Sequence, residues 1–317
     1  MVLEEEGPPL LVGVQDLGGV LVVWDFDWSM IEENSDTFVL RLLGTEELFR
    51  ENQRSMPWTA LMDHVFSAAT SDTGLNRNPD DVFAACAQIP MAHGVPFAIR
   101  SLHARGATQC IISDANEVFI DMILEHLGLR DAIYEIHTNH AHFCATGKSR
   151  RLADGAPQPA RSAAHVLRVQ PYHGCMCGVQ AQGEGDTTGT PASNCCACSP
   201  CCDGAPPADA RGTAHDCDLC PANLCKGRVF QGVLHRWRAA KGGGARRVLY
   251  VGDGTGDLCP ASMLGPEDYV LVRRNYPGQA PPAPLLRAIR ANRRPVAAQV
   301  VEWEPQELGD LLLQHAR

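Results

Sequence analysis

The sequence predicts an α/β fold: a doubly wound, mostly parallel sheet with a small helical cap inserted into it. Four short apolar runs have the composition of strands, and segments with helical periodicity separate them. The connection between the first two runs is far longer than an ordinary crossover. Three of the runs end at polar turns, where the ligands of open α/β sheets bind. The carboxyl edge of the sheet is therefore where we expect a functional site.

The predicted strands are continuous hydrophobic runs rich in Val and Ile, which is typical of a parallel sheet covered by helices on both faces. They span residues 19–24, 107–112, 247–251 and 269–272. The first three end at Asp25, at Ser113 and at Gly252-Asp253-Gly254.

Helical periodicity fills the connections between these strands. Apolar residues recur at helical spacing within residues 32–95, and this predicts the inserted cap. Two further helices are predicted, one from about residue 116 to 127 and one from about 226 to 240. The core then comprises residues 18–31 and 96–317.

Residues 146–214 show no such periodicity, and Gly, Pro, Ala, Ser and Cys dominate there. We interpret this segment as a low-complexity, Cys-rich insertion within the core. Nine of the 14 cysteines lie between Cys175 and Cys220. Those near Cys175 and within residues 195–202 could form a zinc site with Cys217 and Cys220. The alternative is a loop whose cysteines have no specific role.

Composition narrows the classes of protein to consider. The 317 residues are 45% hydrophobic with a net charge of -10, which fits a globular protein and disfavours general nucleic-acid binding. No apolar run is long enough to cross a membrane. The acidic N-terminal residues do not have the charge of a signal peptide, so we expect reduced cysteines and a cytoplasmic location.

Two carboxylates follow the first predicted strand in Asp25-Phe26-Asp27. A turn that begins at Asp25 lets both approach one site. One carboxylate can attack phosphorus, and the other can protonate a leaving oxygen and then activate water. The structural alternative is a loop in which Asp27 caps the next helix.

A second acidic turn, Gly252-Asp253-Gly254-Thr255-Gly256-Asp257, follows the third predicted strand. Its glycines permit a tight turn close to a ligand. With Asp25, Asp253 would form an oxygen-rich site that suits Mg²⁺. The alternative is an ordinary glycine-rich turn.

Ser113 and Lys226 are two further candidates for an anion site. Ser113 stands between a predicted strand and a helix, where its hydroxyl and nearby amides could bind phosphate. Ser113 or the adjacent Asp114 could instead be a helix N-cap. Lys226 opens a helix, where the helix dipole disfavours a cation, so an anionic partner would explain it. An exposed lysine is the alternative.

The order of these motifs resembles that of the haloacid dehalogenase superfamily, whose motifs are DxDx(T/S), a Ser or Thr, a Lys and GDxxxD. Within it, the chain is similar to the phosphoethanolamine/phosphocholine phosphatase family, which includes pyridoxal-phosphate phosphatases and plant pyrophosphatase-like relatives. The resemblance covers about residues 18–143, 168–174 and 215–313. It is carried by Asp25-Phe26-Asp27, Glu33-Asn34-Ser35-Asp36, Ile112-Ser113-Asp114-Ala115-Asn116, Pro171-Tyr172-His173, Cys217-x-x-Cys220-Pro221-Ala222-Asn223-Leu224-Cys225-Lys226 and Gly252-Asp253-Gly254-x-x-Asp257-x-Cys259-Pro260.

This resemblance implies a haloacid dehalogenase-like Rossmannoid core and a magnesium-dependent phosphatase that acts through an aspartyl phosphate. Asp25 would be the nucleophile and a magnesium ligand. Asp27 would be the general acid and base, with its backbone carbonyl on magnesium. Asp253 would be the third magnesium ligand, supported by Asp257.

The remaining roles concern the substrate. Ser29, Ser113 and Lys226 would bind the phosphate. Asp36 and Asp114 would flank the leaving group and attract a cationic head group such as ethanolamine or choline, which disfavours pyrophosphate. Both could equally be helix N-caps.

Ser29 stands where many superfamily members have Thr, and Gly256 stands where many have Asn; the plant-type relatives share the glycine. Serine keeps the hydroxyl, so we expect an active enzyme despite both departures. The alternatives are a pyrophosphatase or pyridoxal-phosphate phosphatase, a phosphotransferase, or an inactive relative that serves as a Cys-rich metal-binding or interaction module.

Overall fold

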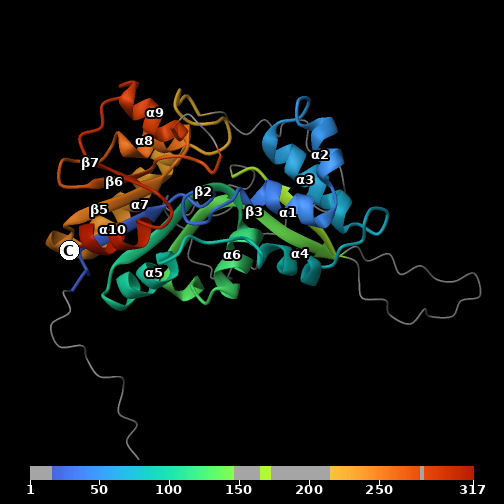
Figure 1. Ribbon diagram of the computed structural model, residues 1–317, viewed down its shortest axis with the longest axis horizontal. Helices are drawn as coiled ribbons and strands as arrows, with labels where there is room; N and C mark the ends of the chain where they lie inside the picture. The colour runs from blue at the N-terminus through green and yellow to red at the C-terminus, as the bar shows by residue number, and fades with distance from the viewer. Residues whose placement is uncertain (1–15, 146–164, 173–214, 279–281) are drawn as a thin grey trace, which may run out of the picture.

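The computed structural model describes residues 16–145, 165–172, 215–278 and 282–317, and these form one seven-stranded sheet (Figure 1). The strand order is β4-β3-β2-β1-β5-β6-β7. All neighbouring strands are parallel except β3 and β4, which are antiparallel. The strands are β1 (Val20–Trp24), β2 (Thr108–Asn116), β3 (Glu135–Ala145), β4 (His165–Gln170), β5 (Arg247–Gly252), β6 (Tyr269–Arg273) and β7 (Gln299–Trp303). The predicted mostly parallel α/β fold is confirmed.

Both faces of the sheet are covered by helices, because successive side chains of each strand point to opposite faces. Val22 and Trp24 of β1 belong to one buried cluster, and Leu21 and Val23 belong to another. The first face packs against α5 (Val95–Ala104), α6 (Glu117–His126) and α10 (Leu308–His315). The second packs against α7 (Lys226–Lys241), α8 (Leu258–Ala261) and α9 (Pro284–Arg290). This is the doubly wound arrangement that continuous apolar strands predict.

Four helices lie between β1 and β2, within the segment predicted to be a helical cap: α1 (Ser35–Leu43), α2 (Glu46–Asn52), α3 (Trp58–Thr70) and α4 (Pro79–Cys86). Helix α3 packs against the β3–β4 hairpin. Arg168 pairs with Asp63 at 2.9 Å, and the Leu167 amide donates to the Thr70 hydroxyl at 2.8 Å. Side chains of these helices also join the buried cluster on the first face of the sheet. The division into core and cap stays a prediction.

Three strands escape the sequence prediction, and a fourth is longer than predicted. Strand β3 has no continuous apolar run because it is rich in His, Thr and Asn. Strand β7 lies at the edge of the sheet, where exposed residues interrupt the apolar pattern. Strand β2 continues past residue 112 to Asn116. Strand β4 lies inside residues 146–214, which were predicted to be a low-complexity insertion. For the residues of β4 that prediction is wrong, because they form a strand of the sheet. Apart from residues 171 and 172, the rest of that segment falls outside the described residues.

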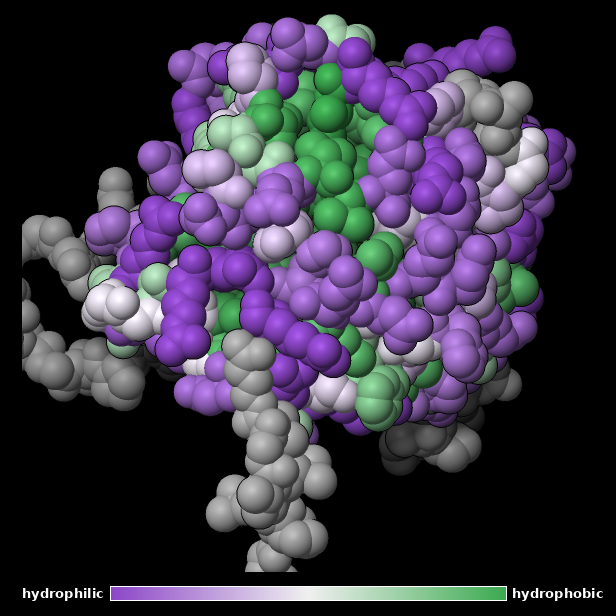
Figure 2. Space-filling view, turned by 60° about the vertical axis from the view of Figure 1, so that its left-hand side comes forward, coloured by the Kyte–Doolittle hydropathy of each residue, from purple (hydrophilic) through white to green (hydrophobic). Residues whose placement is uncertain are grey.

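The helices predicted near residues 116–127 and 226–240 are confirmed as α6 and α7. Among the described residues, no helix is long and apolar enough to cross a membrane. On the face shown in Figure 2, hydrophobic residues gather in a strip bordered by polar and charged ones.

Candidate active site

The turn after β1 places Asp25 at the carboxyl edge of the sheet. Its amide donates to the carbonyl of Val251 at 2.9 Å, which continues the pairing of β1 with β5. The chain then turns tightly, and the carbonyl of Phe26 accepts hydrogen bonds from three following amides. Within this turn Trp28 has a φ of 57°, a left-handed conformation that a bulky residue rarely adopts. The turn directs the chain from Asp25 toward the cap helices.

Lys226, the first residue of α7, links two carboxylates in the buried centre of the site. Its Nζ lies 2.7 Å from Oδ1 of Asp25 and 2.8 Å from Oδ1 of Asp257. Burial alone would lower the pKa of Lys226, but the surrounding carboxylates hold it well above its usual range. The lysine therefore remains a cation, and the alternative of an exposed lysine is wrong.

The turn after β5 is organised around Asp257. One of its oxygens accepts hydrogen bonds from the amides of Asp253 and Gly254, at 3.1 and 2.9 Å. The other accepts from the Tyr250 hydroxyl at 2.7 Å, as well as from Lys226. Both oxygens are thus occupied by protein donors. A side chain at Gly252 would bring its Cβ to 2.7 Å from Cγ of Asp257, so this turn requires glycine.

Asp253 faces Asp25 across the edge of the sheet. Its carboxylate accepts hydrogen bonds from the Ser29 hydroxyl at 3.0 Å and from the Tyr276 hydroxyl. Burial, and then the charge of Asp257, raise the pKa of Asp253 to about 6. Burial is also the main cause that raises the pKa of Asp25 well above its usual range, and the charge of Asp257 is the second.

A divalent cation fits this group of residues. Carboxylate oxygens of Asp25, Asp253 and Asp257 lie within 4.8 Å of one another. Three carboxylates face one ammonium group, so the site has an excess of negative charge, and hard oxygen ligands of this kind suit Mg²⁺. Each oxygen of Asp257 already accepts from two protein donors, whereas each oxygen of Asp253 accepts from one. Asp25 and Asp253 are therefore the better placed direct ligands.

Asp27 is held by the beginning of α1. Its two oxygens accept hydrogen bonds from the Asn34 side chain at 2.7 Å and from the Ser35 amide at 3.0 Å. Burial, and then the nearby charge of Asp36, raise the pKa of Asp27 to about 7. A carboxyl group with this pKa can both donate and accept a proton near neutral pH. The N-cap of α1 is Asn34, although Asp27 also binds the first amide of the helix.

Ser113 and Asp114 lie next to this site on β2. Trp24 pairs with Ile111, so Ser113 reaches the same edge of the sheet as Asp25. Ser113 is buried, and its oxygen accepts a hydrogen bond from the Ala115 amide at 3.2 Å. Burial raises the pKa of Asp114, and the charge of Lys226 opposes this shift. The N-cap of α6 is Asn116, so neither residue caps the helix as the alternative supposed.

Asp36 is buried and bound on both oxygens. It accepts hydrogen bonds from the indole of Trp58 at 3.0 Å and from the side chain of Asn116 at 3.1 Å. Burial raises its pKa to about 6. Its charge also acts on the neighbouring Asp27, whose pKa it helps to raise. Asp36 is not the N-cap of α1 either.

Sequence reasoning missed several residues that support the site. Besides Tyr250 and Tyr276, the main one is Arg273, which is fully buried at the end of β6. It binds both oxygens of Glu32, at 3.1 and 2.5 Å, and donates to the carbonyl of Trp28 at 2.9 Å. Its position just after an apolar strand was the signal that could have identified it.

Comparisons with known proteins agree with this geometry. The family model described as "Putative Phosphatase" matches residues 20–153 and 207–316. A thiamine phosphate phosphatase-like protein of Arabidopsis thaliana is 30% identical over 288 residues, which cover 91% of each chain. Inorganic pyrophosphatase 2 of the same plant is 29% identical over 91% of this chain and 80% of its own.

A third relative is the mouse pyridoxal phosphate phosphatase PHOSPHO2. It is 27% identical over 90% of this chain and 92% of its own. The family match covers more than half of the chain, and the motifs lie together at the carboxyl edge of a doubly wound sheet. The chain therefore belongs to this phosphatase family and is a phosphoric monoester hydrolase of the haloacid dehalogenase superfamily.

Proposed function

We propose that the protein is a magnesium-dependent phosphatase that hydrolyses a small phosphomonoester through a phosphorylated Asp25. The observation that carries this proposal is the contact of Lys226 with Asp25, inside a buried group of three carboxylates. Both contacts of the Asp25 carboxylate, with Lys226 and with the Phe26 amide, involve Oδ1. Neither of these two groups contacts its Oδ2, and this is the oxygen that we assign to the attack on phosphorus.

In the first step, an oxygen of Asp25 forms a bond to phosphorus while the bond from phosphorus to the leaving oxygen breaks. Asp27 transfers its proton to that oxygen, so the alcohol leaves neutral. In the second step, Asp27 takes a proton from water, and the water oxygen attacks phosphorus. Phosphate departs, and Asp25 regains its carboxylate. The pKa of about 7 at Asp27 suits both proton transfers.

The phosphoryl group needs positive charge and donors around its oxygens. When bound by Asp25, Asp253 and the carbonyl of Asp27, Mg²⁺ would supply positive charge to the transferring group. Lys226 supplies a second positive charge from the protein. Ser113 has a hydroxyl proton to donate. The Ser29 hydroxyl donates to Asp253 in this structure and would have to rotate to contact phosphate.

Phosphate release tests the proposal. With Mg²⁺ present, the protein should release phosphate from small monoesters, and Asp25→Asn should lower kcat by about 10,000-fold or more. The control is Asp310→Asn, an exposed residue of α10 that follows the last motif by many residues, which should leave kcat unchanged. Full activity in Asp25→Asn would refute the mechanism. A metal-replete wild-type protein without activity on any monoester would favour the inactive-relative alternative.

The fate of the phosphoryl group separates hydrolysis from phosphotransfer. In the presence of an acceptor alcohol, a phosphatase should release mainly inorganic phosphate. A phosphorylated alcohol as the main product would instead identify a phosphotransferase that uses the same Asp25.

For the substrate, we propose a small monoester with a cationic amine. Asp114 and Asp36 place negative charge beside the site, which attracts an amine and repels a second anion such as that of pyrophosphate. Asp114→Asn should therefore lower kcat/KM for phosphoethanolamine more than for p-nitrophenyl phosphate. Asp36→Asn should also lower kcat/KM more for phosphoethanolamine than for p-nitrophenyl phosphate. The difference should be smaller than for Asp114→Asn, because Trp58 and Asn116 already donate to the Asp36 oxygens. Equal losses for both substrates would contradict this specificity, and a preference for pyrophosphate or pyridoxal phosphate would favour those alternatives.

The thiols also bear on where the protein works. Six cysteines of the described residues are free thiols: Cys86, Cys110, Cys217, Cys220, Cys225 and Cys259. A reducing compartment keeps thiols in this form, so we propose a cytoplasmic location.

A further inference from the structure

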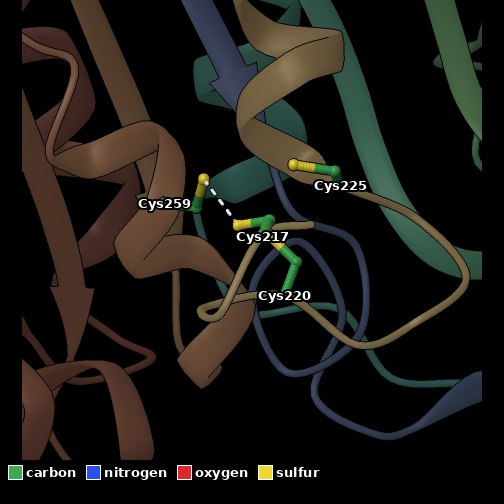
Figure 3. Close-up of side chains that lie close together, drawn as sticks. All are labelled: Cys217, Cys220, Cys225 and Cys259. Atoms are coloured by element: carbon green, nitrogen blue, oxygen red, sulfur yellow. Dashed lines mark hydrogen bonds between the residues drawn. The ribbon is translucent and has the colours of Figure 1, made fainter. Parts of the chain in front are cut away.

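Four cysteines from two separate segments of the chain meet beside the active site. Cys217 and Cys220 lie on the loop before α7, Cys225 is the N-cap of α7, and Cys259 lies on α8. Their sulfur atoms all lie within 4.8 Å of one another. Figure 3 shows Cys217 of the loop directed toward Cys259, with a distance of 3.6 Å between their sulfurs. A disulfide requires a sulfur–sulfur distance of about 2.05 Å, so these are separate thiols.

We propose that these four cysteines bind one structural zinc ion as thiolates. Four sulfur ligands around one point, with no other donor required, is the composition of a closed tetrahedral zinc site. The spacing of the first three, Cys217-x-x-Cys220 and then Cys225, places three ligands on one loop. The fourth, Cys259, comes from the segment that follows the Asp257 turn.

The surrounding backbone is packed tightly around the four sulfurs. The start of α7 lies very close to α8. A Cβ at Gly227 would lie only 2.3 Å from the Cys259 sulfur, so this approach requires glycine.

The position of the site suggests what the zinc ion would do. Lys226 directly follows Cys225, and Asp257 lies two residues before Cys259. The zinc ion would therefore join the loop that carries Lys226 to the turn that carries Asp257, next to their 2.8 Å contact. Its role would be to position Lys226, without contact to the substrate.

This assignment differs from a zinc site built from the cysteines of the insertion. Those residues, Cys175, Cys177 and the five cysteines of 195–202, lie outside the described part of the chain. The structure provides a complete set of four ligands without them.

Metal content of the full-length protein tests the proposal. Protein purified under reducing conditions and washed free of loose metal should retain about one zinc ion per chain. Cys217→Ser and Cys259→Ser should each lose it. Two controls should retain it: Cys144→Ser, whose sulfur is outside the cluster, and a variant with all seven insertion cysteines changed to Ser. Zinc lost with the insertion cysteines and kept in Cys259→Ser would overturn the proposal.

A second measurement covers variants that fail to fold. Wild-type protein loaded with Co²⁺ in place of zinc should show the intense thiolate-to-metal absorption of tetrahedral cobalt sites. A folded, reduced protein that retains no zinc and gives no such spectrum has no metal site here. Mass spectrometry that finds a disulfide between Cys217 and Cys259 in freshly purified protein would also exclude it. None of these readouts depends on phosphatase activity, so they remain valid if the proposed substrate is wrong.

Discussion

Two clusters of potential metal ligands lie side by side where α7 meets the turn after β5, and they differ in chemistry. One consists of the carboxylates of Asp25, Asp253 and Asp257, and the other of the four cysteines Cys217, Cys220, Cys225 and Cys259. Carboxylates favour hard cations such as Mg²⁺, whereas thiolates favour zinc. Neighbouring segments of the chain could therefore hold two different ions without exchange between them.

The clusters also differ in how complete they are. The carboxylate cluster includes a protein cation, Lys226, and an Asp25 oxygen that neither Lys226 nor the Phe26 amide contacts, so it has room for a reacting ligand. The cysteine cluster has four ligands, enough to close a tetrahedral site without substrate. An open site can perform chemistry and a closed one can only stabilise structure. This contrast predicts that changes in the two clusters affect different measurements.

Among changes that compare the two clusters, the largest effect is expected from Lys226→Met, because Lys226 contacts the carboxylate cluster and directly follows Cys225 of the cysteine cluster. Removal of this buried cation leaves Asp25 and Asp257 without their common partner. In metal-free protein we expect a loss of about 3–5 kcal/mol in the free energy of unfolding. With Mg²⁺ present, kcat should fall by about 100- to 1,000-fold. Denaturant unfolding and phosphate release measure these changes.

The control for this variant is Arg228→Met, in the same turn of α7. Arg228 is exposed and pairs with Asp216, so its loss should leave kcat and stability nearly unchanged. Zinc content should also be normal in Lys226→Met, since all four cysteines remain. Lys226→Met with normal kcat would show that this lysine has no part in phosphoryl transfer.

The two clusters show what the sequence could and could not predict. Asp25 and Asp253 follow continuous apolar strands, and the topology of parallel sheets brings such strand ends together. The cysteine cluster was missed because Cys225 and Cys259 lie within motifs noted for other residues, and nothing local indicates that α7 and α8 pack closely. The position of Arg273 at the end of an apolar strand marks it as a candidate, but its partners Glu32 and Trp28 are distant in sequence. Tyr276 likewise contacts Asp253, and a single sequence reveals neither set of contacts. The edge strands escaped because their exposed residues interrupt the apolar pattern.

A medium-sized effect should appear in the pH dependence of magnesium binding. The pKa of Asp253 is raised to about 6, so protons compete with the metal below that pH. Magnesium affinity should therefore fall by up to about tenfold for each pH unit below 6. Titration calorimetry between pH 5 and about 8 would measure this. Asp253→Asn should bind magnesium weakly at every pH, and an affinity independent of pH in the wild-type protein would contradict the assignment of Asp253 as a ligand.

The stability of the metal-free protein should change over the same range. Asp253 and Asp27 have raised pKa values in the folded state, about 6 and about 7, so their protonated forms are favoured by folding. The stability that protonation contributes is fully present below the unfolded value, about 3.8, and is lost as the pH rises through 6 to 7. The increase in Tm caused by saturating magnesium should therefore be larger at pH 7.5 than at about pH 5.5. Added zinc should not reproduce this pattern.

The smallest effect is expected from Gly227→Ala, which tests how closely the cysteine cluster must pack. Alanine in a helix is ordinarily more stabilising than glycine by about 1 kcal/mol. At Gly232, in the same helix, the nearest atom to an added Cβ is the flexible end of Arg236 at 3.4 Å, so Gly232→Ala should raise Tm by a few degrees. At Gly227 the added Cβ would lie 2.3 Å from the Cys259 sulfur, which must then move away from the other three. Gly227→Ala should therefore lower Tm and weaken zinc retention, measured by metal analysis after dialysis against a chelator. An equal stabilisation by both substitutions would mean that the sulfur can move freely, and that no ion holds the four cysteines together.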